Sequence, residues 1–592
     1  MKTHELSRRV VPTVLMHVLV WLAACCFAAE YAEKPWPAPV PGFVPVAAGE
    51  HPRLLFRKAD LPTLRKKAET PAGQAIIARL KMILGGGETM PTVFSKEPAV
   101  NTGGKNITYP PGAFTISHGA GFGLLYQLTG DRKYADLARQ CVEKLFEGQV
   151  DTDTRYNLLT PGTGFRLGAV YQGIALAYDL CYDGWPAEYR KGLVERLQTI
   201  KPKKVDKDQY FSLEDLAKAG GYPPGSNHFG AYILGPGMVA LAFQGDPGAD
   251  DKRLDAILAT TEASLKRQLG EGFGDHGWFA EGTACGRISS NGILPLIESL
   301  KVAAGKDYVS PRPAGRYTVL RLMHEIVRLE NQPEVPARGD YGGDRIWQWK
   351  HSISFGGDFA AGMGAVLPDE ARAMAWIYDH FGEPGEKNTW DSYYPHQAVY
   401  AFVNWPETTL EPDKVLPKVM VDDIHGYYVC RNRWQDADDT VVTTQLKRGP
   451  GGYKSGRVQK GNIVWSFGRK MSFGSLSGKT AHFRAGADGS MELADEKGES
   501  LAIDFSGNCG APVLVAATGK ISIPRGPKGK LDIASAQVVN AGGRDVTVLT
   551  FSPPPGEKPA VKADGAEITV GKQTIKAAGG KLSLRQFTGV EK

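Results

Sequence analysis

The strongest constraint on the fold is a repeat of paired segments between residues 51 and 405. Each unit begins with a Gly- and Ala-rich apolar segment, turns at a polar stretch, and continues as a charged amphipathic segment. The turns fall near residues 130, 184, 246, 305 and 368, so the period is about 54 to 63 residues. The apolar segments of the five units are 118–130, 165–184, 227–246, 286–305 and 351–367.

This repeat predicts stacked helical hairpins. An apolar segment without a polar face is typical of a buried helix, whereas a segment with one charged face is typical of an outer helix. Units that each bury one face against their neighbours form solenoids or rings. We therefore expect an (α/α) toroid over residues 51–410, with an inner and an outer ring of helices. Loops at one end of the inner ring would then build the binding region.

After about residue 411 the helical period disappears. Short runs with alternating β-prone residues replace it, and Gly, Pro, Asn and Asp separate them. This pattern predicts an antiparallel β-sandwich over residues 411–592. The expected strands lie within 440–446, 461–468, 500–506, 513–518, 545–551 and 566–570.

Residues 1–28 have the form of a secretory signal, because basic residues precede a short apolar run and small residues follow it. The predicted cleavage follows Ala28. Leu22 to Cys25 also resembles a lipobox, so a lipid anchor at Cys25 remains an alternative. Residues 29–50 are proline-rich and predict an extended linker or arm. We expect a secreted or periplasmic protein without a membrane span.

Composition narrows the class of protein further. Hydrophobic residues are 42% and charged residues 23% of the chain, which is a globular composition. The net charge is +6, but no long basic run or nucleic-acid module is present, so no nucleic-acid partner is expected. Two of the 7 cysteines lie within residues 1–28, and the others form no CxxC pair. They predict small buried hydrophobic residues rather than disulfides or a zinc site.

The first candidate site is Asn227–His228, at the start of an apolar helix that follows the turn YPPGS. This position puts His228 at the end of the helix where the inner loops meet, and histidine is the usual proton-transfer group. A simpler interpretation remains open. Ser226 or Asn227 would cap the helix, and His228 would be an ordinary packed histidine.

The second candidate is the glycine-rich segment 270–287, which carries Asp275, His276, Trp278 and Glu281. Loops with mixed charges and an aromatic residue are frequent functional sites. Asp275 and Glu281 would also provide the carboxylate pair that glycoside hydrolysis requires. Alternatively, these carboxylates cap the following helix and interact with its dipole.

The third candidate is the glycine turn 447–462, which carries Tyr453, Lys454 and Arg457. It would bring a phenol and positive charge over the helical ring, or it is a solvated hairpin tip. A fourth stretch, 338–351, contains two Trp residues, which suit sugar stacking but more often pack in cores.

These motifs together resemble the heparinase II/III-like polysaccharide lyases and their alginate-lyase relatives. The resemblance covers most of the chain after residue 50, in the order toroid and then sandwich. It rests on HPRLLFRKADLPTLRKKA (51–68), NHFGAYILG (227–235), FGDHGWFAEG (273–282), the segment 449–474 and, more weakly, KTAHFRAG (479–486).

The resemblance implies β-elimination on a uronate-containing acidic polysaccharide. Asn227 would bind the uronate carboxylate, and His228 would neutralise it or act as the base. A positioned arginine grips a carboxylate with two hydrogen bonds. We predict the catalytic residues His228, Tyr453, His276 and Glu281, and the substrate-binding residues Asn227, Arg287, Lys454, Arg457, Trp278 and Asp275.

Two departures from the family pattern matter. Cys285 stands where the family tyrosine is expected, so Tyr453 and His276 are the predicted replacements for the acid and base. The glycine turn lacks the family's His-x-His-x-Asp, so no zinc or other cofactor is expected, although His482 is retained. Two alternatives stay open: a glycoside hydrolase that uses Asp275 and Glu281, and a non-catalytic glycan-binding protein.

Overall fold

The structure of the 592-residue chain is a computed structural model. It describes residues 36–94, 111–204, 208–274, 279, 283–329, 332–334, 357–381, 394–422, 427–435, 439, 441–445, 461–466, 469–473, 480–486, 488–505, 513–518, 533–551 and 559–584. The predicted signal segment and Cys25 lie outside these residues.

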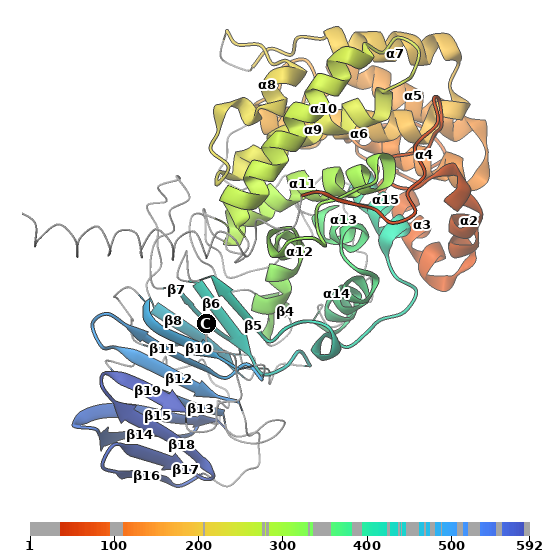
Figure 1. The fold of residues 1–592 in the computed structure, drawn as a ribbon. Helices are drawn as coiled ribbons and strands as arrows, with labels where there is room; N and C mark the ends of the chain where they lie inside the picture. Colours follow the sequence, from red (N-terminus) through yellow and green to blue (C-terminus); the bar gives the residue numbers. More distant parts are fainter. Residues whose placement is uncertain are drawn as a thin grey trace, which may run out of the picture.

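The Gly- and Ala-rich segments form the inner helices of a closed ring (Figure 1). Each inner helix packs against the next one, and the last packs back against the first. The predicted toroid is therefore confirmed. In chain order these helices are α4 (His118–Thr129), α6 (Gly164–Cys181), α9 (Asn227–Phe243), α11 (Thr283–Ala304), α13 (Gly357–Ala365) and α15 (Pro395–Asn404).

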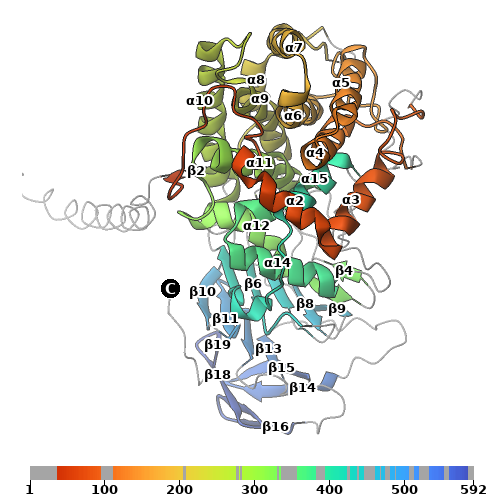
Figure 2. The same cartoon turned by 90° about the vertical axis from the view of Figure 1, so that its right-hand side faces the viewer.

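The charged segments form the outer helices, and each follows its inner helix as the repeat predicts (Figures 1 and 2). A short helix, α8 (Leu213–Ala217), precedes α9. No helix in the described ranges is long and apolar enough to cross a membrane. The outer helices are α5 (Arg132–Phe146), α7 (Ala187–Thr199), α10 (Asp251–Arg267), α12 (Pro313–Glu325) and α14 (Pro368–Phe381).

The five-unit repeat did not predict how the ring closes. The last inner helix, α15, packs against α3 (Pro71–Ile83), which follows α2 (Leu61–Glu69) near the beginning of the helical part. Lys67 reinforces this contact, because its Nζ donates to the carbonyl oxygens of Val403 at 3.1 Å and Trp405 at 2.7 Å. A cation at the carboxyl end of α15 also complements the helix dipole.

The inner helices are rich in glycine because their backbones nearly touch. A Cβ atom on Gly168 of α6 would lie 2.2 Å from the carbonyl oxygen of Ala231 in α9. A Cβ atom on Gly235 would lie 2.8 Å from the Cα atom of Gly168. Close-packed interiors leave no room for such an atom. The glycines therefore set the distance between neighbouring inner helices.

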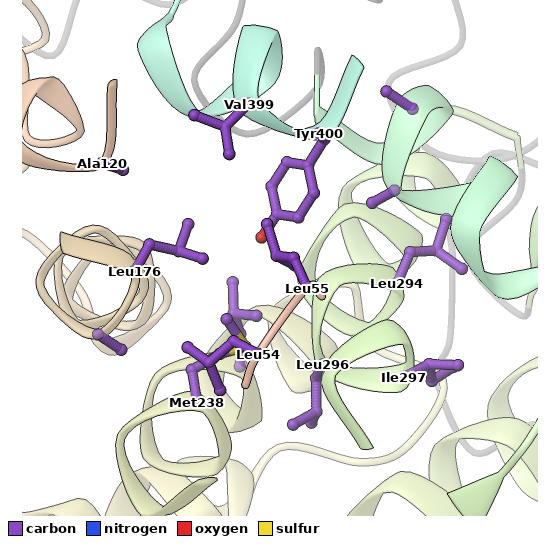
Figure 3. Packing of buried hydrophobic residues seen from close by; sticks show 14 of the residues in the cluster. Leu54, Leu55, Ala120, Leu176, Met238, Leu294, Leu296, Ile297, Val399 and Tyr400 are labelled. Atoms are coloured by element: carbon purple, nitrogen blue, oxygen red, sulfur yellow. The ribbon is translucent and has the colours of Figure 1, made fainter. Parts of the chain in front are cut away.

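The N-terminal segment 51–56 fills the centre of this ring. Leu54 is 0% exposed and Leu55 4% exposed. Figure 3 shows both side chains surrounded by residues of different inner helices, among them Leu176, Met238 and Tyr400. The predicted arm precedes this segment, and its described part, residues 36–50, includes strand β1 (Ala38–Pro39), which pairs with β2 (Lys306–Asp307).

Charged side chains fix this central segment to the carboxyl ends of α6 and α9. The ring nitrogens of His51 lie 2.7 Å from Oδ1 of Asp179 and 3.0 Å from Oδ2 of Asp246. The guanidinium of Arg53 donates to Oδ2 of Asp246 at 3.0 Å and to the carbonyl oxygen of Ala242 at 2.5 Å. Each of these buried side chains has at least one partner in the cluster, as buried charges require, although Nε of Arg53 and Oδ1 of Asp246 have no hydrogen-bond partner among the described residues.

Three antiparallel sheets follow the ring, and every expected strand segment contains a strand. The sheet nearest the ring in sequence consists of β5 (Val419–Asp422), β6 (Tyr427–Arg431), β7 (Val441–Gln445), β8 (Gly461–Ser466) and β9 (Arg469–Phe473). A short hairpin inside the helical part pairs β3 (Val327–Leu329) with β4 (Gln332–Glu334).

The second sheet has the order β10-β11-β12-β13-β15-β14, and the third has the order β16-β17-β18-β19. They pack together through a shared apolar cluster that includes Val548 and Ile575. Their strands are β10 (Thr480–Ala485), β11 (Met491–Asp495), β12 (Ser500–Asp504), β13 (Val513–Thr518), β14 (Ile533–Ala541), β15 (Arg544–Phe551), β16 (Val561–Asp564), β17 (Glu567–Val570), β18 (Gln573–Ala578) and β19 (Lys581–Leu584).

The first sheet is joined to the ring by Arg431 of β6. Its Nη1 donates to the carbonyl oxygens of Met323, His324 and Ile326 at the carboxyl end of α12, at 3.2, 3.1 and 3.0 Å. Asp439 balances its charge at 3.3 Å. The helical and strand parts are thus connected by a buried, neutralised contact.

We predict that Gly168→Ala destabilises the protein while Gly192→Ala does not. The new methyl group at residue 168 would overlap the backbone of α9, and overpacking costs about 1–3 kcal/mol. Gly192 lies in the outer helix α7 with nothing within 4 Å of a Cβ atom, so alanine there would leave the free energy of unfolding unchanged or raise it by up to about 1 kcal/mol. Chemical denaturation measures both. Equal effects would contradict close packing of the inner helices.

Candidate active site

The inner helices α6 and α9 begin at the same end of the ring. The hydroxyl of Tyr232, in the second turn of α9, accepts a hydrogen bond from the backbone N–H of Gly164 at the start of α6, at 3.2 Å. We call this the amino end of the ring. Helix N-termini carry partial positive charge and unpaired N–H groups, so side chains placed here lie in a field that favours anions.

Helix α9 begins with a cap that places His228 in its first turn. The hydroxyl of Ser226 accepts a hydrogen bond from the backbone N–H of His228 at 3.3 Å, and Asn227 is the first helical residue. The capping role that the sequence suggested is thus confirmed for Ser226. It does not exclude a functional role, because the cap fixes the backbone of His228 and leaves the imidazole to other contacts.

Aromatic rings surround the imidazole of His228. Its centroid lies 4.6 Å from that of Tyr222, 5.1 Å from that of Phe165 and 6.3 Å from that of Tyr232. The side chain is half-buried, and its Nδ1 has no hydrogen-bond partner among the described residues. Phe165, Arg166, Tyr222, His228 and Tyr232 are called the His228 cluster below.

The surroundings keep the imidazole of His228 unprotonated at neutral pH. Burial, followed by the positive charges of Arg166 and Lys204, lowers the pKa of His228 to about 4. The imidazole is therefore neutral at neutral pH and carries a lone pair that can accept a proton. A neutral imidazole provides no positive charge, which favours the base among the two roles suggested by the sequence.

Two other histidines begin inner helices, and both are packing groups. His118 of α4 is completely buried, and its Nδ1 accepts a hydrogen bond from the backbone N–H of Thr115 at 2.9 Å. Burial lowers the pKa of His118 to about 3. His396 of α15 is also buried, and its Nδ1 lies 2.9 Å from the hydroxyl of Ser117. Both histidines thus differ from His228, whose side chain is partly exposed.

Most of the other predicted site residues lie outside the described residues. Asn227 and His228 are described and adjacent in α9. Arg287 and Cys285 lie in the first turns of α11, but their side chains are not among those described. The convergence of both parts of the chain on one site therefore stays a prediction. The residues outside the described ranges are Asp275, His276, Trp278, Glu281, Tyr453, Lys454 and Arg457.

Sequence analysis missed the neighbours of His228. Phe165 and Arg166 occur as the dipeptide FR at the start of α6, where they looked like the edge of an apolar segment. Tyr222 precedes the two prolines before α9. Their position could have identified them, because each of these residues lies at or just before the start of an inner helix.

The described residues contain no group of three or more His, Cys, Asp or Glu side chains arranged to hold a metal ion. His482, from the segment that weakly resembles the family's later motif, lies in β10 with its Nε2 3.1 Å from Oε2 of Glu492. The other oxygen of Glu492 accepts a hydrogen bond from the backbone N–H of Leu584 at 2.6 Å. His482 thus contributes to a buried contact between two sheets.

No protein-family model matches the chain, and no curated protein matches it. Among solved structures, the chain is similar to a heparinase III, with 10% identity over 96% of this chain and 97% of that chain, and a TM-score of 0.40. A heparan sulfate lyase from Pedobacter heparinus is 12% identical over 90% of this chain and 94% of its own, with a TM-score of 0.44. An alginate lyase from Bacteroides ovatus is 15% identical over 59% of this chain and 99% of its own, with a TM-score of 0.35. Because these scores are below 0.5, function is inferred below from the residues of this chain.

We predict that the imidazole of His228 titrates with a pKa near 4 rather than near 6.5. Arg166→Gln would raise this pKa because it removes a positive charge, but the pKa would stay below 6.5 because burial is the larger cause. NMR titration of isotope-labelled histidine measures both values. Arg190→Gln, in α7 beyond the carboxyl end of α6, would leave the pKa unchanged. A value near 6.5 in the unmodified protein would contradict a buried, neutral histidine.

Proposed function

We propose that the chain is a polysaccharide lyase that cleaves an acidic polysaccharide by β-elimination. The observation that carries this proposal is His228, a half-buried imidazole at the amino end of the ring with a lowered pKa. Its Nδ1 is buried without a hydrogen-bond partner among the described residues, so Nε2 would be the nitrogen that accepts the proton. The motif resemblance supports it, because NHFGAYILG matches the family's Asn–His segment at these residues. A secreted or periplasmic location, with or without a lipid anchor at Cys25, belongs to the same proposal.

The reaction requires a base, an electrostatic partner for the carboxylate, and an acid. The base removes the C5 proton, and the electrons of the C–H bond form the C4–C5 double bond. The C4–O bond then breaks, and the leaving oxygen takes up a proton. Negative charge builds on the carboxylate beside C5, so donors and positive charge must already point there. We assign the base to His228 and carboxylate binding to Asn227.

The remaining predicted residues complete this proposal. Tyr453 would donate the proton to the leaving oxygen. Arg287, Lys454 and Arg457 would supply positive charge from the two parts of the chain. His276, Glu281, Asp275 and Trp278 would line the same site from the segment before α11. The alternatives predict different products, because hydrolysis gives no unsaturated sugar and a binding protein leaves the polymer intact.

We predict that His228→Ala lowers turnover of the cleaved polymer by about 10²–10⁴-fold, the usual effect of removing a positioned acid–base group. Absorbance of the unsaturated uronate in the near ultraviolet measures turnover on a panel of uronate polymers. The melting temperature would change little, because the lost ring is half-buried and pairs no polar group through Nδ1.

His380→Ala is the matched control for this variant. His380 also stacks on an aromatic ring, with its centroid 3.8 Å from that of Trp376, but it is exposed on the outer helix α14. Its replacement would leave turnover unchanged. Full activity of His228→Ala would contradict the proposed base, and reducing ends without an unsaturated product would identify a hydrolase instead.

A further inference from the structure

A second member of the His228 cluster, Arg166, carries a partly buried charge with an unusual set of contacts. Arg166 is the third residue of α6, and its guanidinium lies 4.5 Å from the ring centroid of Phe165 and 5.9 Å from that of Tyr156. Its Nη1 donates to the hydroxyl of Thr163 at 3.3 Å, and its Nε is buried without a hydrogen-bond partner. No carboxylate in the described part of the chain lies within 4.0 Å of it.

Two other partly or fully buried arginines show the usual arrangement. Arg155, in the loop before α6, donates to both oxygens of Asp153, at 2.7 and 2.5 Å. Arg53, at the centre of the ring, pairs with Asp246 at 3.0 Å. Burying a cation without an anion is costly, and burial is the main cause that lowers the pKa of Arg166. The guanidinium of Arg166 is therefore available to an anion from outside the described residues.

Arg166 and His228 approach the same aromatic ring. The guanidinium lies 4.5 Å from the centroid of Phe165, and the imidazole centroid lies 5.1 Å from it. Both side chains also come from the first turn of an inner helix, where the helix dipole favours negative charge. One acidic sugar lying across Phe165 would thus meet a proton acceptor on one side and a cation on the other.

We propose that Arg166 binds the carboxylate of the uronate whose C5 proton is removed. This inference rests on the proposed function. Because the imidazole of His228 is neutral at neutral pH, the positive charge that stabilises the developing carboxylate dianion must come from another group. Guanidinium matches a planar carboxylate with two parallel hydrogen bonds and remains charged at every relevant pH. Lys204, which also lowers the pKa of His228, adds a second positive charge at this end.

The test measures binding separately from cleavage. Calorimetry of the full chain at neutral pH uses oligosaccharides of alginate, heparan sulfate, hyaluronan and chondroitin sulfate, each in native and carboxyl-reduced form. The unmodified protein would prefer a native oligosaccharide to its reduced form. Arg166→Gln would weaken binding of the native form by about 10–100-fold and leave the reduced form unchanged, as loss of a charge-assisted hydrogen bond predicts.

Three variants keep the result interpretable. Arg166→Met retains the apolar stem against Phe165, so it tests the charge if the glutamine variant fails to fold. Arg166→Lys would bind at an intermediate strength, because it keeps the charge and loses the planar fork. Arg190→Gln would bind like the unmodified protein, since Arg190 stacks at 3.9 Å on Tyr182 beyond the far end of α6.

Each outcome separates this inference from the proposed function. Binding that Arg166→Met and Arg166→Gln do not weaken, or weaken equally for native and reduced forms, would overturn the carboxylate site even if an unsaturated product forms. A loss that disappears when a sulfated oligosaccharide is desulfated would assign Arg166 to sulfate and also overturn it. If the Arg166 variants lose binding only to the native oligosaccharide and no unsaturated product forms, the carboxylate site would be supported and the proposed β-elimination would be contradicted. Failure to bind any native oligosaccharide would overturn both.

Discussion

The buried polar contacts of His51 and Arg53 hold together the centre on which the ring depends. A ring of six inner helices encloses a space that side chains from the helices alone do not fill, and Leu54 and Leu55 occupy it. The backbone N–H and C=O groups of an extended segment in such a place need hydrogen-bond partners. The N–H groups of Arg53 and Leu54 both donate to Asp179, at 2.9 Å, and this carboxylate in turn faces His51. Apolar filling and charge neutralisation are therefore achieved by the same few residues.

The two ends of the ring differ in how their polar groups are used. At the carboxyl end, the carboxylates of Asp179 and Asp246 lie within 3.0 Å of nitrogen atoms of His51 and Arg53, so each described carboxylate there has a partner inside the protein. At the amino end, the imidazole of His228 and the guanidinium of Arg166 lie among aromatic rings, and no carboxylate of the described residues lies within 4.0 Å of Arg166, although Asp153 acts on it from further away. The end of the ring with paired charges thus supports the end at which we propose the active site, which is how precise sites are generally held.

The sequence predicted the helices and strands better than the contacts between them. The alternation of apolar and charged segments was sufficient for five helical hairpins, because each hairpin is local in sequence. The closure of α15 on α3 depends on helices at opposite ends of the toroid, so no local period could indicate it. Strand β14 was missed because IASAQVVNA is an edge strand with polar, exposed positions and little alternation. At the site, His228 was part of a sequence motif, whereas Arg166 could be recognised only from its contact with Phe165 and from the lack of an ion pair within 4.0 Å among the described residues.

Ring closure has a consequence for how the chain acquires its structure. Lys67 and Val403, which meet where the ring closes, are 336 residues apart in sequence. Contacts of such long range raise the contact order and slow folding. Until α15 has docked, the apolar flank of α4 is exposed, since α15 covers it in the finished ring. The open ring would be the aggregation-prone intermediate of this protein, and the time spent in it would be set by the last inner helix rather than by the first five hairpins.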